Sequence, residues 1–232
     1  VHTNGAHTRN VGIDDAQGEF VAFLDSDDEW RPNRLESAMA VILERVGVDF
    51  FSYSRYVVVF EGGRSSIALP VRGIRLREQV GDYVFAAGCG MQTSTFFCST
   101  QVARRIRFDE RWSRHQDTDF VLRMEAAGIP IIFDESLSAQ YHFGASDLRK
   151  RIHEGRISVS FCEDWIRAHR GLLSAKATSG YRLLVVSRIR YLSGDWLGAL
   201  REVALSLFGL GLAGFADLMV VRLRARHRKT RS

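Results

Sequence analysis

The chain has 232 residues, of which 46% are hydrophobic and 25% charged, a composition typical of a globular protein rather than a disordered or fibrous one. Its formal net charge is +5, but six of the last eleven residues are Arg or Lys, so much of the excess charge lies in a C-terminal tail. Such a tail is either a solvated end or a segment attracted to anionic lipid head groups. The three cysteines are too few and too scattered for a disulfide framework or a zinc site, which favours a reducing cytosolic compartment.

The first expected elements are a helix and a short strand. Residues 2–17 place scattered apolar residues among polar ones, which indicates a weakly amphipathic helix ended by Gly18. Residues 20–24 are five apolar residues in a row, and such a run is typical of a short strand buried on both faces. In an open α/β sheet, ligands bind beyond the carboxyl ends of the strands. The residues that follow this strand therefore form the first candidate site.

Three acids, Asp25, Asp27 and Asp28, stand at the end of this strand. Carboxylates crowded into a small volume repel one another, and a hard divalent cation such as Mg2+ or Mn2+, often carrying substrate phosphates, is the usual solution. The alternative is that these acids cap the next helix, which Pro32 would begin. Because one cap needs one acid, the three acids favour the cation site.

The middle of the chain predicts further helices and strands. A helix is expected from Pro32 to Gly47, with an apolar face formed by Leu35, Met39, Ile42, Leu43 and Val46. The next expected elements are a strand over 48–53, a hairpin over 56–71, a helix over 76–87 and a strand over 92–99. The hydroxyl residues 93–95 either line a polar pocket or form an ordinary capped loop, and both alternatives stay open.

A second acidic group stands at the start of a helix expected over residues 116–127. Asp117 and Asp119 lie in its first turn, where acids satisfy free N–H groups, so simple capping is the alternative to a functional role. Asp119 and Arg123 are four residues apart and are predicted to form an ion pair on the helix surface. Two closing strands are expected afterwards, over 129–133 and 137–141.

The character of the sequence changes beyond His142, which ends the last expected strand. Residues 147–232 are predicted to be helical almost throughout. The most apolar stretch, 204–221, is broken by glycines and by Asp217, which argues against a full membrane span. An interfacial segment followed by the basic tail and a helical hairpin packed on the core both fit this stretch. We therefore divide the chain into a core, residues 1–146, and a helical C-terminal region, residues 147–232.

Several short motifs stand in order between residues 4 and 145. They are Ala-His-Thr-Arg-Asn-Val-Gly-Ile at 6–13, Asp-Ser-Asp-Asp at 25–28, Phe-Asp-Glu at 108–110 and Gln-Asp-Thr-Asp-Phe-Val-Leu-Arg at 116–123. In this combination the chain resembles the family 2 glycosyltransferases with the GT-A fold. The resemblance implies an α/β protein with a GT-A (Rossmann-like) mixed sheet flanked by helices and a helical C-terminal extension.

The resemblance also implies a reaction, in which a sugar is transferred with inversion from a nucleotide-diphosphate-sugar donor to an acceptor hydroxyl. The matching positions make Asp117 the catalytic base, and they place Mg2+ or Mn2+ on Asp25 and Asp27, against the donor diphosphate. Arg9 and Asn10 fall in the donor-binding segment. His142 is a candidate for the metal shell, although a lone histidine is more often structural.

Two departures from the family pattern are visible. Gln116 stands where the family commonly has Glu. The family's first strand and the loop after it, which hold the base and ribose of the donor, would lie upstream of Val1, so the chain is expected to be N-terminally truncated.

The apolar stretch and the basic tail suit an enzyme of cell-surface polysaccharide or glycolipid synthesis, cytoplasmic and peripheral on the inner face of the cell membrane. The expected partners are a nucleotide-sugar donor, a saccharide or lipid-linked acceptor and an anionic membrane surface, with no nucleic acid. Two alternatives from other classes remain. A metal-dependent phosphohydrolase could use the same acids after a strand but leaves the Asp117 segment unexplained, and a non-catalytic membrane-associated scaffold would need neither site.

Overall fold

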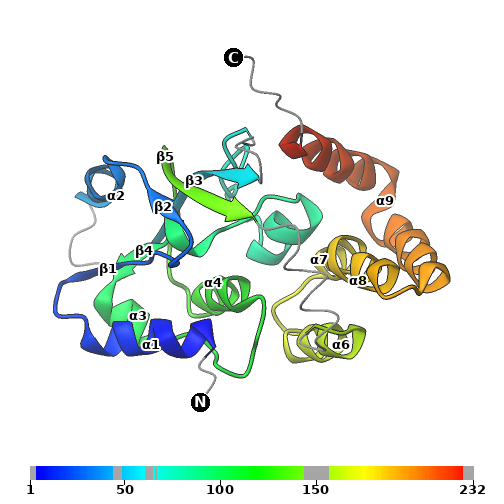
Figure 1. Ribbon diagram of the computed structural model, residues 1–232, viewed down its shortest axis with the longest axis horizontal. Coiled ribbons are helices and arrows are strands. Elements are labelled where there is room, and N and C mark those ends of the chain that lie inside the picture. The colour runs from blue at the N-terminus through cyan, green and yellow to red at the C-terminus, as the bar shows by residue number, and fades with distance from the viewer. Residues whose placement is uncertain (1–3, 44–48, 61–64, 66, 144–156, 227–232) are drawn as a thin grey trace.

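The computed structural model describes residues 4–43, 49–60, 65, 67–143 and 157–226 (Figure 1). In this part of the chain, a five-stranded sheet has the order β1-β4-β3-β5-β2, with β3 and β5 parallel and the other pairings antiparallel. Helices flank the sheet, and a helical C-terminal region lies beside it. The predicted α/β class with a mixed sheet is therefore confirmed. The strands are β1 (Phe20–Ala22), β2 (Glu29–Trp30), β3 (Phe51–Phe60), β4 (Phe97–Ser99) and β5 (Ile131–Phe143).

Helices and short helical turns connect these strands and continue after them. The helices at the two predicted site segments, α1 and α4, begin and end close to the expected positions. The helical elements are α1 (Gly5–Asp15), α2 (Arg34–Ile42), η2 (Asp82–Ala86), η3 (Thr93–Thr95), α3 (Thr100–Ile106), α4 (Gln116–Ala126), α6 (Val159–Ala168), α7 (Ala175–Tyr181), η4 (Arg182–Val186), α8 (Ser187–Leu192) and α9 (Trp196–Arg226).

The acidic segment follows a strand, as expected, but β1 is not buried on both faces. It pairs with β4 alone among the described strands and lies at the edge of the sheet. Its three residues are half-buried, and Leu24 beyond it is 47% exposed. The prediction of a doubly buried strand was wrong because an apolar run does not reveal whether a strand has one neighbour or two.

Two pairs of predicted strands are each a single long strand. β3 and β5 pair in parallel from Phe51 opposite Ile131 to Phe60 opposite Phe143. The polar residues that suggested breaks instead coincide with shifts in the register on both sides of Arg55, which is how a bulge accommodates an extra residue. Among the described residues, the expected hairpin is present as isolated antiparallel bridges, of which Tyr56 to Leu69 is one, and its predicted turn, 61–64, lies outside those residues.

Helix α2 buries only part of the predicted apolar face. Leu35 and Leu43 are 49% and 65% exposed, whereas Ala38 and Ile42 are buried. Arg34 is buried as well, because its Nη2 donates to the carbonyl oxygens of residues 95 and 96, at 2.7 and 3.3 Å. Burial lowers the pKa of Arg34 to about 10. The predicted apolar face is therefore confirmed at Ile42 and Met39 and wrong at Leu35 and Leu43. Val46 lies outside the described residues.

The segment from 76 to 99 contains less regular structure than expected. The predicted helix over 76–87 is reduced to the short turn η2 and its approach, and the predicted strand over 92–99 begins with the turn η3 before β4. All three residues of η3 are buried. Sequence reasoning missed α3, which follows β4 directly with Ser99 as its cap.

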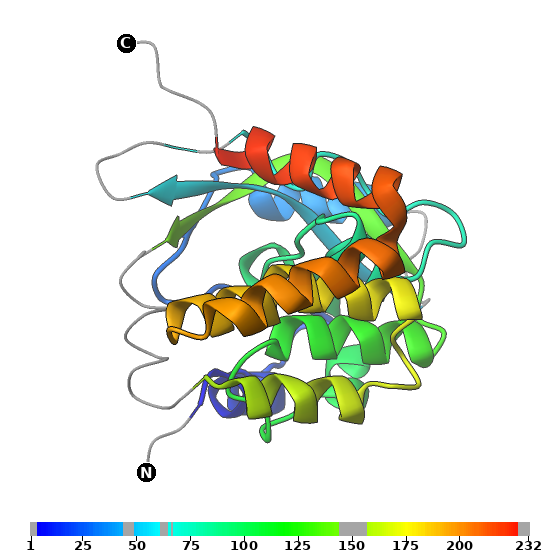
Figure 2. The same ribbon diagram turned by 90° about the vertical axis from the view of Figure 1, so that its right-hand side faces the viewer.

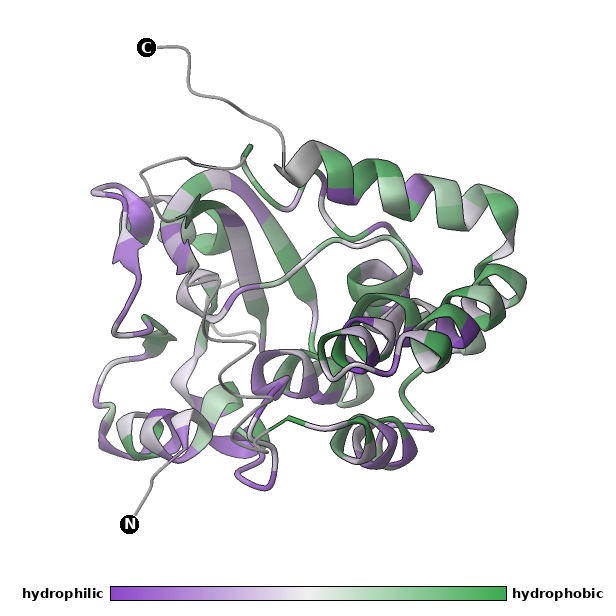
Figure 3. Cartoon of the chain, turned by 45° about the vertical axis from the view of Figure 1, so that its right-hand side comes forward, coloured by the Kyte–Doolittle hydropathy of each residue, from purple (hydrophilic) through white to green (hydrophobic). Residues whose placement is uncertain are grey.

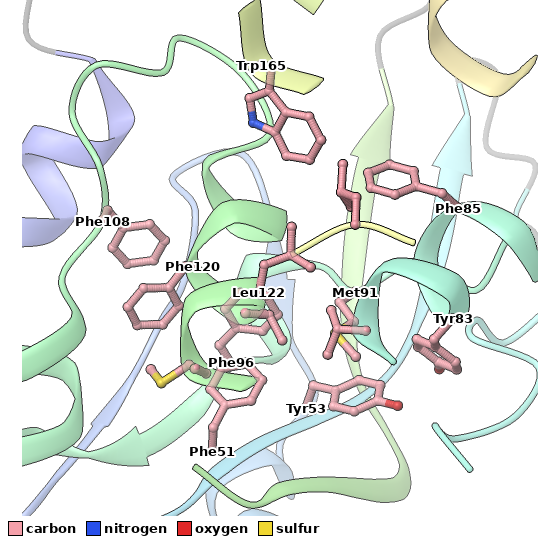
Figure 4. Packing of buried hydrophobic residues seen from close by; sticks show 14 of the residues in the cluster. Phe51, Tyr53, Tyr83, Phe85, Met91, Phe96, Phe108, Phe120, Leu122 and Trp165 are labelled. Atoms are coloured by element: carbon pink, nitrogen blue, oxygen red, sulfur yellow. The ribbon is translucent and has the colours of Figure 1, made fainter. Parts of the chain in front are cut away.

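A cluster of aromatic rings holds α4 against the sheet (Figure 4). Phe120 of α4 stacks on Phe108, with ring centroids 4.2 Å apart and planes 7° apart. Phe51 of β3 and Phe96 before β4 meet edge to face at 4.9 Å, and Phe120 lies over both. Because such packing leaves little freedom, the first turn of α4 has a fixed position relative to the strand ends.

The C-terminal region packs on the core through α7 and the long helix α9. Gly211 has φ +69° and breaks α9 into two halves, which Figure 2 shows as an orange and a red segment joined by a bend. In the second half, Leu218 packs on Gly88, where an added Cβ would approach Leu218 Cδ1 to 2.6 Å. In the first half, Gly209 passes close to Ser179 of α7. The second half of α9 is therefore fitted to the core, and the first half to α7 of the C-terminal region.

The outward side of α9 is apolar. Phe208 and Leu212 are 89% and 81% exposed, and Figure 3 shows hydrophobic colour along much of this helix. Residues Trp196–Leu223 are long and apolar enough to cross a membrane by length and composition alone. Of the two alternatives for this stretch, packing on the core is what the structure shows, and the exposed side is the part available to an interface.

Candidate active site

Arg9 connects the two acidic segments. From α1, its Nη2 and Nε donate to Asp25 Oδ1 at 2.5 and 3.1 Å, and its Nη1 donates to Gln116 Oε1 at 2.9 Å. Asp25 follows β1, whereas Gln116 is the first residue of α4 and precedes Asp117. The structure thus brings three of the predicted site residues, Arg9, Asp25 and Asp117, to one place although they are distant in sequence.

The three acids after β1 have separate environments. Asp28 is buried and accepts hydrogen bonds from Ser94 Oγ at 2.6 Å, from Gln92 Nε2 and from the backbone N–H of His142 at 3.2 Å. Burial raises the pKa of Asp28 in spite of these bonds. Ser94 Oγ also accepts from the Asp25 backbone N–H at 3.0 Å, so this hydroxyl fixes the shape of the acidic turn. Asp28 is a structural anchor.

Asp27 and His142 do not form a compact metal site with Asp25. Asp27 is exposed in the turn, and the His142 ring lies 3.5 Å from Glu29 Oε1. Within the described residues, no three His, Cys, Asp or Glu side chains are grouped as metal ligands would be. The pairing of β2 with β5 brings His142 beside Glu29, and its place in a metal shell with Asp25 and Asp27 stays a prediction. Asp25 and Asp27 alone remain as the predicted pair of oxygen ligands.

Asn10, predicted to bind the donor, is buried and makes structural contacts. Its Oδ1 accepts from the Phe108 N–H at 2.8 Å, and its Nδ2 donates to the Phe108 carbonyl at 2.9 Å and to Glu110 Oε1 at 2.8 Å. These bonds occupy the amide on both sides. Asn10 therefore joins α1 to the Phe-Asp-Glu segment, and its contact with the donor stays a prediction.

Asp117 lines the cleft from the first turn of α4. Its Oδ1 accepts from the Thr118 N–H at 2.7 Å and from Thr118 Oγ1 at 3.4 Å. Burial raises the pKa of Asp117, and the nearby Asp25 adds to this effect, while Arg9 opposes it. His115, two residues earlier, has φ +59°, a left-handed conformation that is strained for a histidine. A carboxyl group with a raised pKa at the end of a strained loop is suited to accept a proton.

Asp119 forms the predicted ion pair with Arg123, with Asp119 Oδ2 and Arg123 Nη2 2.5 Å apart. The pair is confirmed, but Asp119 is buried and Arg123 is half-buried, so the pair does not lie on the open helix surface. Asp119 Oδ1 also lies 2.7 Å from His169 Nε2, and His169 Nδ1 lies 2.7 Å from the carbonyl oxygen of Trp165. Both His169 and Asp119 are almost fully buried. This cluster anchors the C-terminal region to the helix that carries Asp117.

A cleft of about 570 Å3 joins these residues. It also contains residues that sequence reasoning missed, chiefly arginines and tyrosines from distant segments. The only sequence signal for any of them was the position of Arg114 and His115 just before the Gln116-Asp117 pair. The lining residues are Arg9, Asp25, Tyr56, Val58, Phe60, Leu69, Met91, Gln92, Thr93, Ser113, Arg114, His115, Gln116, Asp117, Tyr141, Arg188 and Arg222.

Comparison with known proteins gives consistent results. The family described as glycosyl transferase family 2 matches residues 3–112. The chain is 33% identical over 185 residues to the amylovoran biosynthesis glycosyltransferase AmsB of Erwinia amylovora, covering 77% of this chain and 59% of AmsB. It is 25% identical over 205 residues to the putative colanic acid biosynthesis glycosyl transferase WcaA of Escherichia coli strain K12, covering 84% of this chain and 68% of WcaA.

Solved structures with the same fold include TarS residues 1–349 of S. aureus. The TM-score is 0.53 at 15% identity, covering 96% of this chain and 67% of the TarS chain. TarS in complex with UDP-GlcNAc gives a TM-score of 0.51. At this identity the likeness establishes the fold alone, which is GT-A. The sequence matches show that the chain belongs to glycosyltransferase family 2.

Proposed function

We propose that this chain transfers a sugar from a nucleotide-diphosphate-sugar donor to an acceptor hydroxyl, with inversion at the anomeric carbon. The observation that carries the proposal is the Arg9 bridge, which holds Asp25 and the start of α4 in one cleft. The carboxylate proposed for the donor side, on Asp25, and the candidate base, Asp117, then lie close enough to act on one sugar. A phosphohydrolase would need only the donor-side carboxylate and not the base.

Asp117 is the proposed base. In a single displacement, the acceptor hydroxyl attacks from the face opposite the leaving group, and its proton must be taken up on that face. Oδ1 of Asp117 is bound by Thr118, which fixes the direction of the carboxylate and leaves Oδ2 as the proposed proton acceptor. Its raised pKa makes it a stronger base than an exposed aspartate.

Asp25 and Asp27 are the proposed ligands of Mg2+ or Mn2+. Carboxylate oxygens are the donor type that these hard cations prefer, so the pair fits the expected ion. When bound, the ion would neutralise charge on the diphosphate leaving group. Arg9 holds Asp25 Oδ1, so it orients the carboxylate whose other oxygen would reach the ion.

We further propose a role in cell-surface polysaccharide synthesis, in the cytoplasm and at the inner face of the cell membrane. AmsB and WcaA are named for amylovoran and colanic acid biosynthesis, which supports this context. The exposed apolar side of α9 and the basic residues at the C-terminus support contact with an anionic membrane. The solved complex of TarS with UDP-GlcNAc makes a UDP-sugar the first donor to try.

The test is calorimetric titration with a panel of nucleotide sugars, with and without Mn2+. We expect one nucleotide sugar to bind in a Mn2+-dependent way, and Asp27→Ala to weaken that binding at least tenfold. Asp15→Ala, which removes an exposed acid at the end of α1, is the matched control and should change nothing. Binding that is equally strong without Mn2+ and in Asp27→Ala would contradict the metal role.

A second variant tests the base. Asp117→Asn should bind the donor and Mn2+ normally and lose transfer to acceptor, because only the proton acceptor is removed. If Asp117→Asn transferred sugar at the normal rate, the assignment of the base would be wrong. Phosphate release without any acceptor would favour the phosphohydrolase alternative.

A further inference from the structure

The cleft continues beyond Asp117 into a second chamber of about 270 Å3. This chamber lies toward the C-terminal region, since α8 and α9 and the preceding turn η4 contribute part of its wall. The two chambers share Asp117, Tyr56 and three arginines. Arg9, Asp25 and Gln116 line only the first chamber. Asp117 therefore stands between the proposed donor side and this second chamber.

The second chamber is rich in positive charge. Arg114 precedes α4, Arg188 belongs to α8 and Arg222 to α9, so three separate segments each supply one guanidinium. Asp117 is the one carboxylate among the lining residues described for this chamber. His115 adds no charge, because burial and the neighbouring Arg114 hold its pKa well below the usual value. The lining thus favours an anionic group, and guanidinium groups are suited to phosphate.

The remainder of the wall is largely apolar. Its apolar side chains include Val84, Phe85, Leu184, Val185, Ile189 and Val221. The volume is below the roughly 300–1,000 Å3 typical of sites that enclose a whole drug-sized ligand, so only the end of a larger molecule would enter. Guanidinium groups beside an apolar wall suit a phosphate ester whose substituent is apolar or is a sugar.

We infer that this chamber binds the acceptor, and that the acceptor carries a phosphate or diphosphate group held by Arg114, Arg188 and Arg222. The inference rests on the proposed function, because it identifies the acceptor side as the side of Asp117 away from Asp25. The base must contact the attacking hydroxyl, and the leaving diphosphate must lie on the opposite face of the sugar. With the donor phosphates beside Asp25, the three arginines, which line both chambers, extend the positive charge past Asp117 to the acceptor side.

Binding of three simple probes, measured by calorimetry in EDTA, tests the charge and the apolar part separately. The probes are octyl phosphate, glucose 1-phosphate and the uncharged octyl glucoside. We expect both phosphates to bind and octyl glucoside not to bind. Octyl phosphate binding at least tenfold tighter than glucose 1-phosphate supports a lipid-linked phosphate as the source, and equal binding supports a water-soluble sugar phosphate. Binding of octyl glucoside as tight as octyl phosphate overturns the inference.

Two exposed arginines allow the site to be mapped without disturbing the fold. Arg188→Gln and Arg222→Gln should each weaken phosphate-probe binding about tenfold or more, since each removes a charge-assisted contact. Arg201→Gln, an exposed arginine of α9 outside both chambers, is the matched control and should bind as the parent protein does. Phosphate binding that survives both Arg188→Gln and Arg222→Gln overturns the assignment.

The same variants separate this inference from the proposed function. Because Arg188 and Arg222 line both chambers, Mn2+-dependent binding of the nucleotide sugar should fall in Arg188→Gln and Arg222→Gln by much less than phosphate-probe binding does, and transfer should show a raised KM for the phosphorylated acceptor. If these substitutions instead weaken nucleotide-sugar binding as much as phosphate-probe binding, the arginines hold the donor, and the inference fails while the proposed function stands. If no nucleotide sugar binds the parent protein, the proposed function fails, and the acceptor assignment fails with it.

Discussion

His169→Ala should destabilise the protein substantially, because it removes the contact that joins α6 to α4. His169 Nε2 lies 2.7 Å from Asp119 Oδ1, and His169 Nδ1 lies 2.7 Å from the Trp165 carbonyl oxygen. His169, Asp119 and Trp165 are all buried. A carbonyl oxygen only accepts, so Nδ1 donates to it, and Nε2 is the ring atom that faces the Asp119 carboxylate. Arg123 alone then remains as the described partner of the buried Asp119.

The expected cost is about 3 kcal/mol, since a hydrogen bond to a charged group contributes ~1.5–3 kcal/mol and a neutral one about 1 kcal/mol. For a protein of this size, a loss of 1 kcal/mol lowers Tm by roughly 2–4 °C, so the expected fall is about 6–12 °C. The assay is thermal unfolding followed by circular dichroism, with urea unfolding as a check.

Arg167→Ala is the matched control, because it removes an exposed ion pair to Asp164 from the same helix. An exposed substitution of this kind should change stability by no more than about 0.5 kcal/mol. If His169→Ala lowered Tm by no more than Arg167→Ala does, the buried cluster would contribute nothing measurable, and the reasoning from its geometry would be refuted.

Further predictions concern the active site and the packing of the C-terminal region. Burial raises the pKa of Asp117, so its protonated, inactive form should persist to higher pH. The acid limb of the pH profile of kcat/KM should therefore lie above the ordinary Asp pKa of about 3.9. A limb at or below that value would contradict the assignment of Asp117 as the base. Arg9→Ala should weaken nucleotide-sugar binding about tenfold in calorimetry, because the charge-assisted bridge between the acidic turn and α4 is lost, and unchanged affinity would exclude that role. Gly180→Ala should cost roughly 1–3 kcal/mol in urea unfolding, because its Cβ would come within 2.2 Å of the Phe85 carbonyl oxygen. Gly171→Ala, where a Cβ meets nothing within 4 Å, should be close to neutral; equal effects of the two substitutions would show that close packing is not the cause.

The sequence predicted those features that depend on local patterns. The helix that begins at Gln116 has acids in its first turn and an apolar face, so its residue pattern alone places Asp117 at a helix start. The different roles of Asp27 and Asp28 could not be predicted in this way. Asp28 is buried only because residues 92–94 and the end of β5 approach it, and such contacts have no local signature.

The arginines of the second chamber illustrate the same limit more strongly. Arg188 and Arg222 lie in helices far along the chain, where a basic residue is usually a solvated one. They reach the cleft because α8 and α9 fold back over the core. Burial of Arg34 and of His169 likewise depends on partners more than 40 residues away. Sequence reasoning named Arg9, Asp25 and Asp117, which the structure brings together, and missed the other half of the cleft.

The bend at Gly211 makes two possible roles of α9 mutually exclusive. Beyond the bend, Leu218 lies on Gly88, and Val221 and Arg222 form part of the cleft wall. A straight helix crossing a bilayer would have to withdraw these residues and open one side of the cleft to water. The segment can therefore close the active site or traverse a membrane, but it cannot do both at once. In the closed form, its contact with a bilayer would be sideways, through Phe208 and Leu212, with the cleft intact beneath.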